Sequence, residues 1–95
     1  MQGTHLKLHD IDCPILRGQV KELIEDLCRL CPSDAEITAQ VCHVENGYRA
    51  EVCVASEGAS MKAEDTSPAL FETLAHLRWK LLLQILDWRN RRFAT

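Results

Sequence analysis

Five cysteines are the side chains of this 95-residue chain best suited to redox or metal chemistry. Two of them, Cys28 and Cys31, form a Cys-x-x-Cys motif. A redox dithiol needs its nucleophilic thiolate stabilised, usually by the positive N-terminal end of a helix dipole. The motif falls instead near the predicted C-terminal end of a helix, where backbone carbonyls oppose a thiolate. Its position therefore argues against redox catalysis.

A zinc site would require two further ligands close to this pair. Cys42 and His43 are the nearest candidates, and they complete neither a second Cys-x-x-Cys nor a His-x-x-x-His motif. Cysteine often behaves as a small buried apolar side chain, so we expect no metal and no cofactor. An odd number of cysteines without an N-terminal export signal predicts reduced thiols in a cytoplasmic protein.

The remaining residues with chemical potential do not form a catalytic pattern. His5, His9 and His76 occur singly, and single histidines on strands and helices are usually structural or solvated. The chain has no glycine-rich phosphate loop, no Gly-x-Ser-x-Gly motif and no carboxylate pair with a placed partner. We therefore expect a protein that is not an enzyme and has no small-molecule substrate.

Charge is distributed unevenly along the chain. Residues 1–65 carry six basic and twelve acidic residues, a net charge of −6, whereas residues 66–95 carry five basic and two acidic residues, a net charge of +3. A polyanionic partner would therefore meet the C-terminal part of the chain. The basic residues there are Arg78, Lys80, Arg89, Arg91 and Arg92.

Hydrophobic periodicity predicts the elements that position these residues. Alternation over residues 4–9 predicts a first strand. From Leu16 to Cys31 the apolar residues recur at three- and four-residue steps, which is typical of an amphipathic helix, and Pro32 ends it. No apolar run is long enough to cross a bilayer, so no membrane partner is expected.

Two alternating segments on either side of Asn46-Gly47 predict a β-hairpin, because a type I′ turn favours these two residues. The pairs expected from this turn are Val41 with Val52, Ala39 with Val54, Gln40 with Cys53, and Cys42 with Glu51. Cys42 and Cys53 would then project from the same face in diagonal register, with no base fixed beside either.

The C-terminal third predicts one more strand and a long helix. Residues 59–64 alternate, and Thr66-Ser67-Pro68 predicts a helix start with a hydroxyl cap. This helix is expected from Pro68 to Arg92. The chain as a whole (1–95) reads as one α+β domain, β-α-β-β-β-α, with a four-stranded, mainly antiparallel sheet and both helices packed on one face.

The last predicted helix carries two apolar stripes, and a small sheet can cover only one. The first consists of Leu70, Leu74, Leu77, Leu81, Ile85 and Trp88, and the second of Trp79, Leu82, Leu83, Leu86 and Phe93. Two interpretations of the second stripe remain open. It packs against the helix of residues 16–30, or Trp79, Leu83, Leu86 and Phe93 form a partner surface, most simply that of a homodimer.

Several segments resemble one known family. Residues 11–20 (IDCPILRGQV) resemble its entry from the first strand into the first helix, and residues 46–52 (NGYRAEV) its central hairpin. Residues 61–67 (MKAEDTS) lead into a long helix with Leu77, Lys80 and Gln84, as in that family. The family is that of the ribosome hibernation-promoting factors and ribosome-associated inhibitors, also called sigma-54 modulation proteins.

The resemblance covers nearly the whole chain and implies a β-α-β-β-β-α fold and a role in blocking translation at the small ribosomal subunit. It implies contacts to ribosomal RNA phosphates by the last helix. The implied residues are Lys80, Arg89, Arg91 and Arg92, together with Arg17 and Arg78. Unlike family members, this chain has an acidic first helix, with Glu22, Glu25 and Asp26.

Three hypotheses follow from these observations. The first is a non-enzymatic, ribosome-associated regulator of translation that binds small-subunit RNA through its last helix. The second is a protein-protein module of the same fold that self-associates through the second apolar stripe and does not bind the ribosome. The third, a minor one, is thiol or metal chemistry at Cys28 and Cys31 or at Cys42 and Cys53.

Overall fold

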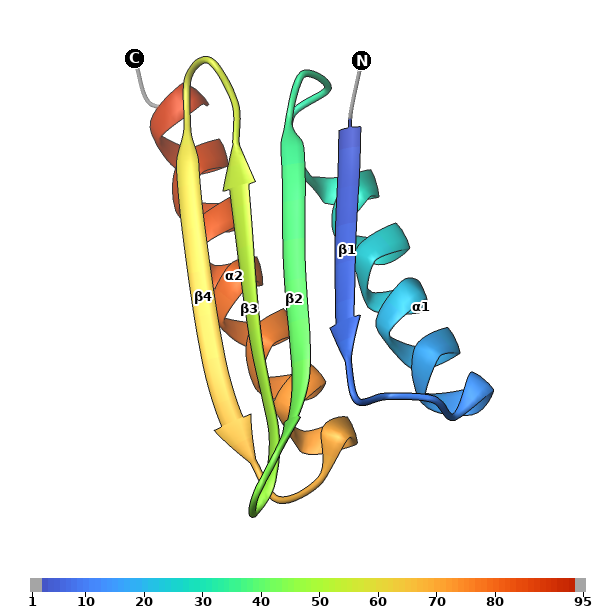
Figure 1. Cartoon of the computed structure of the whole chain (residues 1–95). Helices are drawn as coiled ribbons and strands as arrows, with labels where there is room; N and C mark the ends of the chain where they lie inside the picture. Colours follow the sequence, from blue (N-terminus) through green and yellow to red (C-terminus); the bar gives the residue numbers. More distant parts are fainter. Residues whose placement is uncertain (1–2, 94–95) are drawn as a thin grey trace.

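The structure is a computed structural model that describes residues 3–93, and its elements follow the predicted order (Figure 1). The elements are β1 (Gly3–His9), α1 (Pro14–Leu30), β2 (Glu36–Val44), β3 (Gly47–Ala55), β4 (Ser60–Ser67) and α2 (Leu70–Phe93). The α+β class and the β-α-β-β-β-α order predicted from hydrophobic periodicity are confirmed.

The four strands form one sheet in the order β1-β2-β3-β4. β1 runs parallel to β2, whereas β2 with β3 and β3 with β4 are antiparallel. A parallel pair needs a crossover connection, and α1 supplies it. Both helices lie behind the sheet in Figure 1, so one face of the sheet carries the core and the other faces solvent. The predicted open sheet, covered on one face by both helices, is confirmed.

The register of the β2–β3 hairpin differs from the predicted register by two residues. Val41 lies opposite Ala50, so its expected pairing with Val52 is wrong. The turn contains residues 45–46, and Gly47 is already the first residue of β3. Because side chains alternate along a strand with a period of two, a two-residue shift leaves every side chain on its predicted face.

Gly47 is required by a close approach of two backbone segments rather than by the centre of the turn. Its φ is +153°, and a Cβ atom there would clash with the Ser67 carbonyl oxygen and lie 2.8 Å from Pro68 Cα. Only glycine accepts both conditions without displacing the neighbouring backbone. The end of β4 therefore selects glycine at the start of β3.

β4 extends three residues beyond its predicted end, and α2 begins correspondingly later. Ser67 is still paired with β3, so the predicted helix cap at Ser67 is wrong. The first turn of α2 instead starts after Ala69, whose carbonyl accepts the Thr73 N–H at 3.1 Å. The Ser67 hydroxyl is engaged by Asp65 and His76, which explains why it does not cap the helix.

The core lies between the inner face of the sheet and one stripe of each helix. α1 buries Val20, Leu23, Ile24 and Leu27. α2 buries Leu70, Leu74, Leu77, Leu81 and Ile85, with Trp88 half-buried. The prediction that the first stripe of α2 packs on the sheet is confirmed, and α2 runs unbroken from residue 70 to residue 93. Within residues 3–93, neither helix combines the length and the apolar character needed to cross a lipid bilayer.

Candidate functional site

The Cys-x-x-Cys pair lies at the C-terminal end of α1, where the sequence predicts it. The Cys31 N–H donates to the Leu27 carbonyl as the helix ends. Burial, and then the neighbouring Cys28, raises the pKa of the Cys31 thiol to about 11. Burial, followed by the charge of Glu25, also raises the pKa of Cys28. Both shifts disfavour the thiolate that redox catalysis needs, and no group of His, Cys, Asp and Glu in the described chain is arranged to hold a metal ion.

Cys42 and Cys53 share the exposed face of the sheet, but their predicted diagonal register is wrong. Cys42 lies opposite Arg49 and Cys53 lies opposite Thr38, because the hairpin is shifted by two residues. The Cys53 thiol instead donates to Glu51 Oε1 at 3.7 Å. Burial and then the charge of Glu51 raise the pKa of Cys53, so this thiol too is held in its protonated form.

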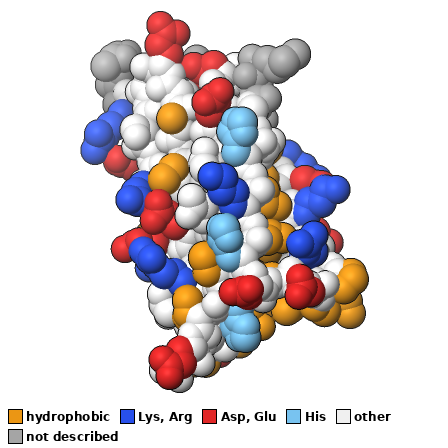
Figure 2. All heavy atoms as spheres, viewed as in Figure 1, with side chains coloured by type: hydrophobic (Ala, Val, Ile, Leu, Met, Phe, Trp, Pro, Cys, Tyr) orange, Lys and Arg blue, Asp and Glu red, His pale blue; other side chains and the backbone are white. Residues whose placement is uncertain are grey.

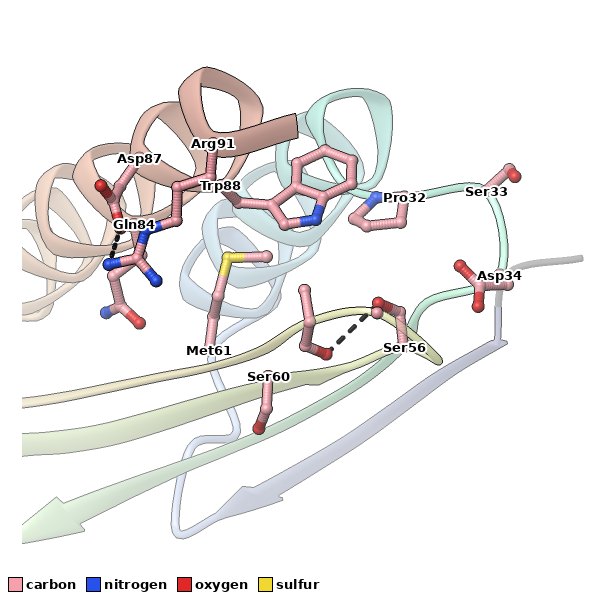
Figure 3. Close-up of a pocket in the computed structure, with 12 residues that line it drawn as sticks. Pro32, Ser33, Asp34, Ser56, Ser60, Met61, Gln84, Asp87, Trp88 and Arg91 are labelled. Carbon is pink, nitrogen blue, oxygen red and sulfur yellow. Dashed lines mark hydrogen bonds and ion pairs between the residues drawn. The ribbon is translucent and has the colours of Figure 1, made fainter. Parts of the chain in front are cut away.

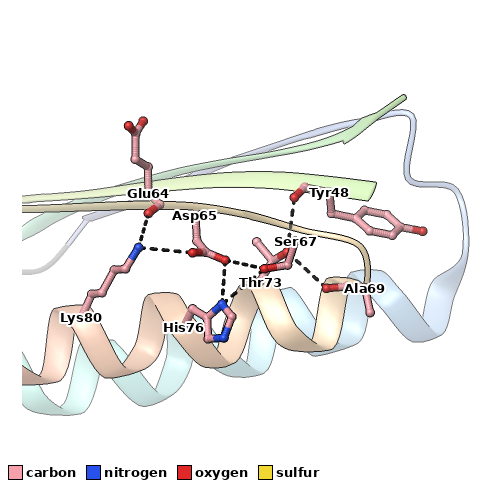
Figure 4. Close-up of polar contacts among 8 residues, drawn as sticks. All are labelled: Tyr48, Glu64, Asp65, Ser67, Ala69, Thr73, His76 and Lys80. Atoms are coloured by element: carbon pink, nitrogen blue, oxygen red, sulfur yellow. Dashed lines mark hydrogen bonds and ion pairs between the residues drawn. The ribbon is translucent and has the colours of Figure 1, made fainter. Parts of the chain in front are cut away.

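A polar cluster, called here the polar clamp, joins β4 to α2 (Figure 4). It consists of Asp65, Ser67, His76 and Lys80. The Ser67 hydroxyl donates to Asp65 Oδ2 at 2.7 Å, and His76 Nδ1 lies 2.9 Å from the same oxygen. Lys80 Nζ donates to Asp65 Oδ1 at 3.2 Å and to the Glu64 carbonyl at 2.8 Å. One carboxylate thus gathers three side chains and fastens α2 to the edge of the sheet.

The electrostatics of the polar clamp favour an ionised Asp65. Partial burial acts to raise the pKa of this carboxyl, but hydrogen bonds from Ser67, His76 and Lys80 outweigh it, so the pKa is lowered. These hydrogen bonds are stronger to the ionised carboxylate than to the neutral acid, so they weaken when Asp65 is protonated. The clamp therefore holds at neutral pH and weakens in acid.

The polar clamp contains a serine, a histidine and an aspartate, yet its geometry does not activate the serine. In a catalytic triad the histidine stands between the other two side chains. Here the Ser67 hydroxyl donates directly to Asp65, and Ser67 is only 7% exposed. The cluster was hidden in the sequence because Ser67 matches a helix-cap pattern and because His76 and Lys80 come from another element, α2. The arrangement of the polar clamp supports a structural role, the attachment of α2 to β4, rather than a catalytic one.

Three of the basic residues expected at an RNA interface are spread over the molecule. Arg17 lies near the start of α1, where its Nε donates to the Ile11 carbonyl at 2.9 Å. Lys80 is engaged by Asp65 in the polar clamp. Arg78 is exposed on the helix side of the molecule, beside the groove between α1 and α2.

The other expected RNA-contacting residues lie at the C-terminal end of α2. Arg89 and Arg91, called here the basic tip, are exposed, and Arg91 pairs with Asp87 at 3.0 Å. Exposed pairs one helical turn apart contribute little stability, so Arg91 can exchange its partner for another anion. The side chain of Arg92 lies outside the described part of the structure. Figure 1 shows the start of α1 and the end of α2 at opposite ends of the molecule, so Arg17 does not join the basic tip.

The second apolar stripe of α2 is largely exposed. Trp79, Leu83 and Leu86 are 63%, 49% and 45% exposed, so the interpretation that they pack on α1 is wrong. α2 turns its first stripe toward the sheet, and the half-buried Leu82 lines the groove between α2 and α1. The side chain of Phe93, the fourth residue of the predicted partner surface, is not among those the structure describes.

Phe71 adds to this exposed surface, although it belongs to neither predicted stripe. It is 73% exposed in the first turn of α2. Phe71, Ala75, Trp79 and Leu83 recur every four residues, and this spacing is the pattern that identifies it. Phe71 and Trp79 line a groove of about 690 Å³ between α1 and α2, which also includes Glu22 and Asp26 of α1.

A second cleft of about 760 Å³ opens beside the basic tip (Figure 3). Figure 3 shows the indole of Trp88 beside Pro32, with Met61 beneath it and the Arg91 side chain on its other side. The Ser56 hydroxyl on the opposite wall donates to the Ala59 carbonyl at 3.2 Å. The cleft thus brings Pro32, the Trp88 indole and the Arg91 side chain together at the end of α2.

The comparisons with known proteins identify the fold. No family model matches the chain, and no curated protein sequence matches it. A ribosomal subunit interface protein from Coxiella burnetii has 18% identity and a TM-score of 0.73, over 94% of this chain and 98% of that chain. The N-terminal domain of Protein Y from Thermus thermophilus has 15% identity and a TM-score of 0.72, over 90% of this chain and 98% of that chain.

This chain has their fold. The resemblance to ribosome hibernation factors drawn from the sequence is therefore confirmed at the level of the fold, and the match runs nearly from end to end. At 15–18% identity the likeness lies in the arrangement of elements rather than in shared side chains. The shared fold therefore does not by itself assign functional residues to this chain.

Proposed function

We propose that this protein is a non-enzymatic, ribosome-associated regulator of translation. The observation that carries the proposal is the match over 94% of the chain to a protein described as a ribosomal subunit interface protein. A ribosome partner would place the protein in the cytoplasm. The same class was implied by the resemblance of residues 11–20 and 46–52 to the hibernation-factor family.

Within this proposal, the end of α2 contacts ribosomal RNA. The basic tip offers two exposed guanidinium groups at this end of the helix for contacts to phosphate. Arg78 adds an exposed cation farther back along the same helix, and Arg92 follows the basic tip in the sequence. Lys80 and Arg17 are weaker candidates, because each already donates to a partner within the chain.

The charge balance limits the expected affinity. The chain has a net charge of −3, and α1 exposes acidic residues. Each neutralised phosphate contributes about 0.7 to 0.9 to the slope of log affinity against log salt, so three contacts give a slope of about −2 to −3. Binding should therefore be clear at low salt and weak at physiological salt, unless a further partner supports it.

Co-sedimentation with purified small ribosomal subunits across a salt series tests the proposal. Arg89→Glu with Arg91→Glu should abolish co-sedimentation, because the tip would then repel phosphate. Lys21→Glu with Arg29→Glu changes the net charge equally on α1 and should have little effect. A wild-type protein absent from the ribosome fraction at low salt would exclude the proposal.

A second candidate function is self-association through the exposed stripe of α2, and the exposure of Trp79, Leu83 and Leu86 favours it. The groove also carries opposite charges on its two helices, with Glu22 and Asp26 on α1 and Arg78 on α2. A two-fold partner could match these charges across the interface.

Sedimentation velocity at micromolar concentration distinguishes this candidate from the first. Leu83→Asp with Leu86→Asp should convert dimers to monomers while leaving ribosome binding intact if the two surfaces are separate. The charge reversal of the basic tip should abolish ribosome binding and leave the dimer intact. A wild-type protein that is monomeric at every concentration removes the self-association candidate.

A further inference from the structure

The two edge strands of the sheet, β1 and β4, differ in whether their outward backbone groups are hydrogen-bonded. At the β4 edge, Lys62 N–H donates to Gln84 Oε1 at 3.1 Å, and Gln84 Nε2 donates to the Lys62 carbonyl at 2.8 Å. The next outward carbonyl, that of Glu64, accepts from Lys80 at 2.8 Å. Side chains of α2 thus occupy three outward hydrogen-bonding groups in the middle of β4, and this part of the edge cannot readily accept another strand.

The β1 edge has no such cover. Gly3 N–H donates to the Ala35 carbonyl next to β2, so the odd-numbered residues of β1 bond to β2. Alternation along a strand then turns the N–H and C=O groups of Thr4, Leu6 and Leu8 away from the sheet. Within residues 3–93, no other hydrogen bond reaches these outward groups.

The side chains of β1 define what an added strand would meet. Toward the helices, Leu6 is 40% exposed and Leu8 is half-buried. The start of α1 follows after the short loop of residues 10–13 and carries Ile15, which is 73% exposed. Figure 2 shows hydrophobic side chains gathered on this flank, where β1 and α1 lie side by side.

On its open face, β1 presents a basic row formed by His5, Lys7 and His9. The partner positions on β2 are Thr38, Gln40 and Cys42, none of them acidic. Figure 2 shows histidine and basic side chains in a row along this side of the face, with acidic side chains at the two ends of the row, whereas basic and acidic side chains alternate over the opposite side. There, Arg49 pairs with Glu64 at 3.1 Å, and Lys62 pairs with Glu51 at 3.7 Å. Lys7 forms no ion pair with any described residue.

We propose that β1 accepts an extended segment of another protein as a fifth strand, and that this segment alternates apolar and acidic side chains. Main-chain hydrogen bonds to Thr4, Leu6 and Leu8 supply the attachment, as in other cases of strand addition. The apolar side chains of the segment cover Leu6 and Leu8. Its carboxylates lie beside Lys7, because side chains directly opposite in a sheet interact most strongly.

The charge of β1 disfavours a second copy of this chain as the occupant. Pairing of β1 with itself across a two-fold axis would bring Lys7 of each copy beside the same row of the partner copy, where β1 has no carboxylate to neutralise it. Like charges that face each other across neighbouring strands are destabilising. The surface therefore fits an acidic segment better than it fits itself.

Labelled peptides of about eight residues, the length of an ordinary strand, provide the test. One alternates Val and Glu, and its control alternates Val and Lys. Fluorescence anisotropy should show at least about tenfold tighter binding of the Val-Glu peptide. Lys7→Glu should reverse this preference, whereas Lys62→Glu at the opposite edge should leave it unchanged. Equal binding of both peptides, or a preference untouched by Lys7→Glu, overturns the proposal.

Hydrogen exchange tests the main-chain contacts independently of charge. The amides of Leu6 and Leu8 should gain protection when the Val-Glu peptide saturates the protein. A Val-Glu peptide methylated on alternate backbone nitrogens should bind at least about tenfold more weakly. No gain in protection would overturn the proposal. Protection of Leu6 and Leu8 in a concentration-dependent dimer without peptide would replace it with self-pairing of β1.

Discussion

Gln84 of α2 forms two hydrogen bonds with the backbone of Lys62 in β4, accepting from its N–H at 3.1 Å and donating to its carbonyl at 2.8 Å. A side-chain amide has the same donor and acceptor as a peptide group, so Gln84 substitutes for a neighbouring strand at this position. The contact joins the helix to the sheet and also closes the sheet edge.

Replacement of Gln84 by alanine should therefore have two effects. Loss of both hydrogen bonds should lower the free energy of unfolding by about 1–2 kcal/mol, measured by urea denaturation. Exposure of the β4 edge should also increase association at high protein concentration, measured by light scattering. Gln40→Ala, on the exposed face of β2, is the control and should change stability by less than about 0.5 kcal/mol. Equal behaviour of the two variants would contradict the edge-closing role.

The polar clamp predicts a specific acid sensitivity. The pKa of Asp65 is lowered below its ordinary value of 3.8 in the folded state, so its stabilisation is present above that value. This stabilisation is lost as the pH falls through the folded-state pKa. Asp65→Asn removes the titrating group, so the free energy of unfolding should depend less on pH below about 4. Asp12→Asn, at an exposed position before α1, should retain the wild-type dependence in the same denaturation series.

The thiol of Cys31 predicts a loss of stability in alkali. Its pKa is raised from 9.0 to about 11 in the folded state, so above pH 9 the unfolded chain releases a proton that the folded chain keeps. The free energy of unfolding should then fall progressively between pH 9 and about 11. Cys31→Ala should reduce this slope, whereas Cys13→Ala, at an exposed position, should not. Identical slopes in the two variants would show that Cys31 is not the titrating group.

Alanine substitutions at two glycines should change stability in opposite directions. Gly47→Ala places a Cβ against the Ser67 carbonyl at a positive φ, and should lower the free energy of unfolding by about 2 kcal/mol or more. Gly18 lies in α1, where an added Cβ would meet nothing within 4 Å beyond the backbone of its own helix. Gly18→Ala should therefore raise the free energy of unfolding by about 0.5–1 kcal/mol. Thermal denaturation of both variants measures the contrast. A tolerated Gly47→Ala would mean that the start of β3 can move away from β4.

The order and the faces of the elements could be predicted because they depend on local periodicity. The stripe from Leu70 to Ile85 and the alternation of β2, β3 and β4 each mark one apolar face, and burial follows these patterns. The hairpin register could not be obtained in the same way. A shift of two residues preserves every face, so hydrophobic alternation does not distinguish Val41 opposite Ala50 from Val41 opposite Val52.

The candidate binding surfaces, too, were predicted from the sequence only in part. The concentration of basic residues toward the C-terminus and the second apolar stripe of α2 are visible as local patterns. Contacts between elements decide which of these side chains remain exposed and able to bind a partner. Lys80 is engaged by the polar clamp, whereas Trp79 remains 63% exposed on the wall of the groove between α1 and α2.

The sequence by itself determined the class of fold, the buried face of each element and the charge difference between the two parts of the chain, because each depends on residue type and short-range spacing. Only the tertiary structure decided that Ser67 belongs to a clamp, that Gln84 closes one edge of the sheet and that β1 leaves the other open. The physical reason is that hydrogen bonds such as Lys62 to Gln84 and Lys80 to Asp65 join residues 22 and 15 positions apart. Such partners meet only after the core has packed.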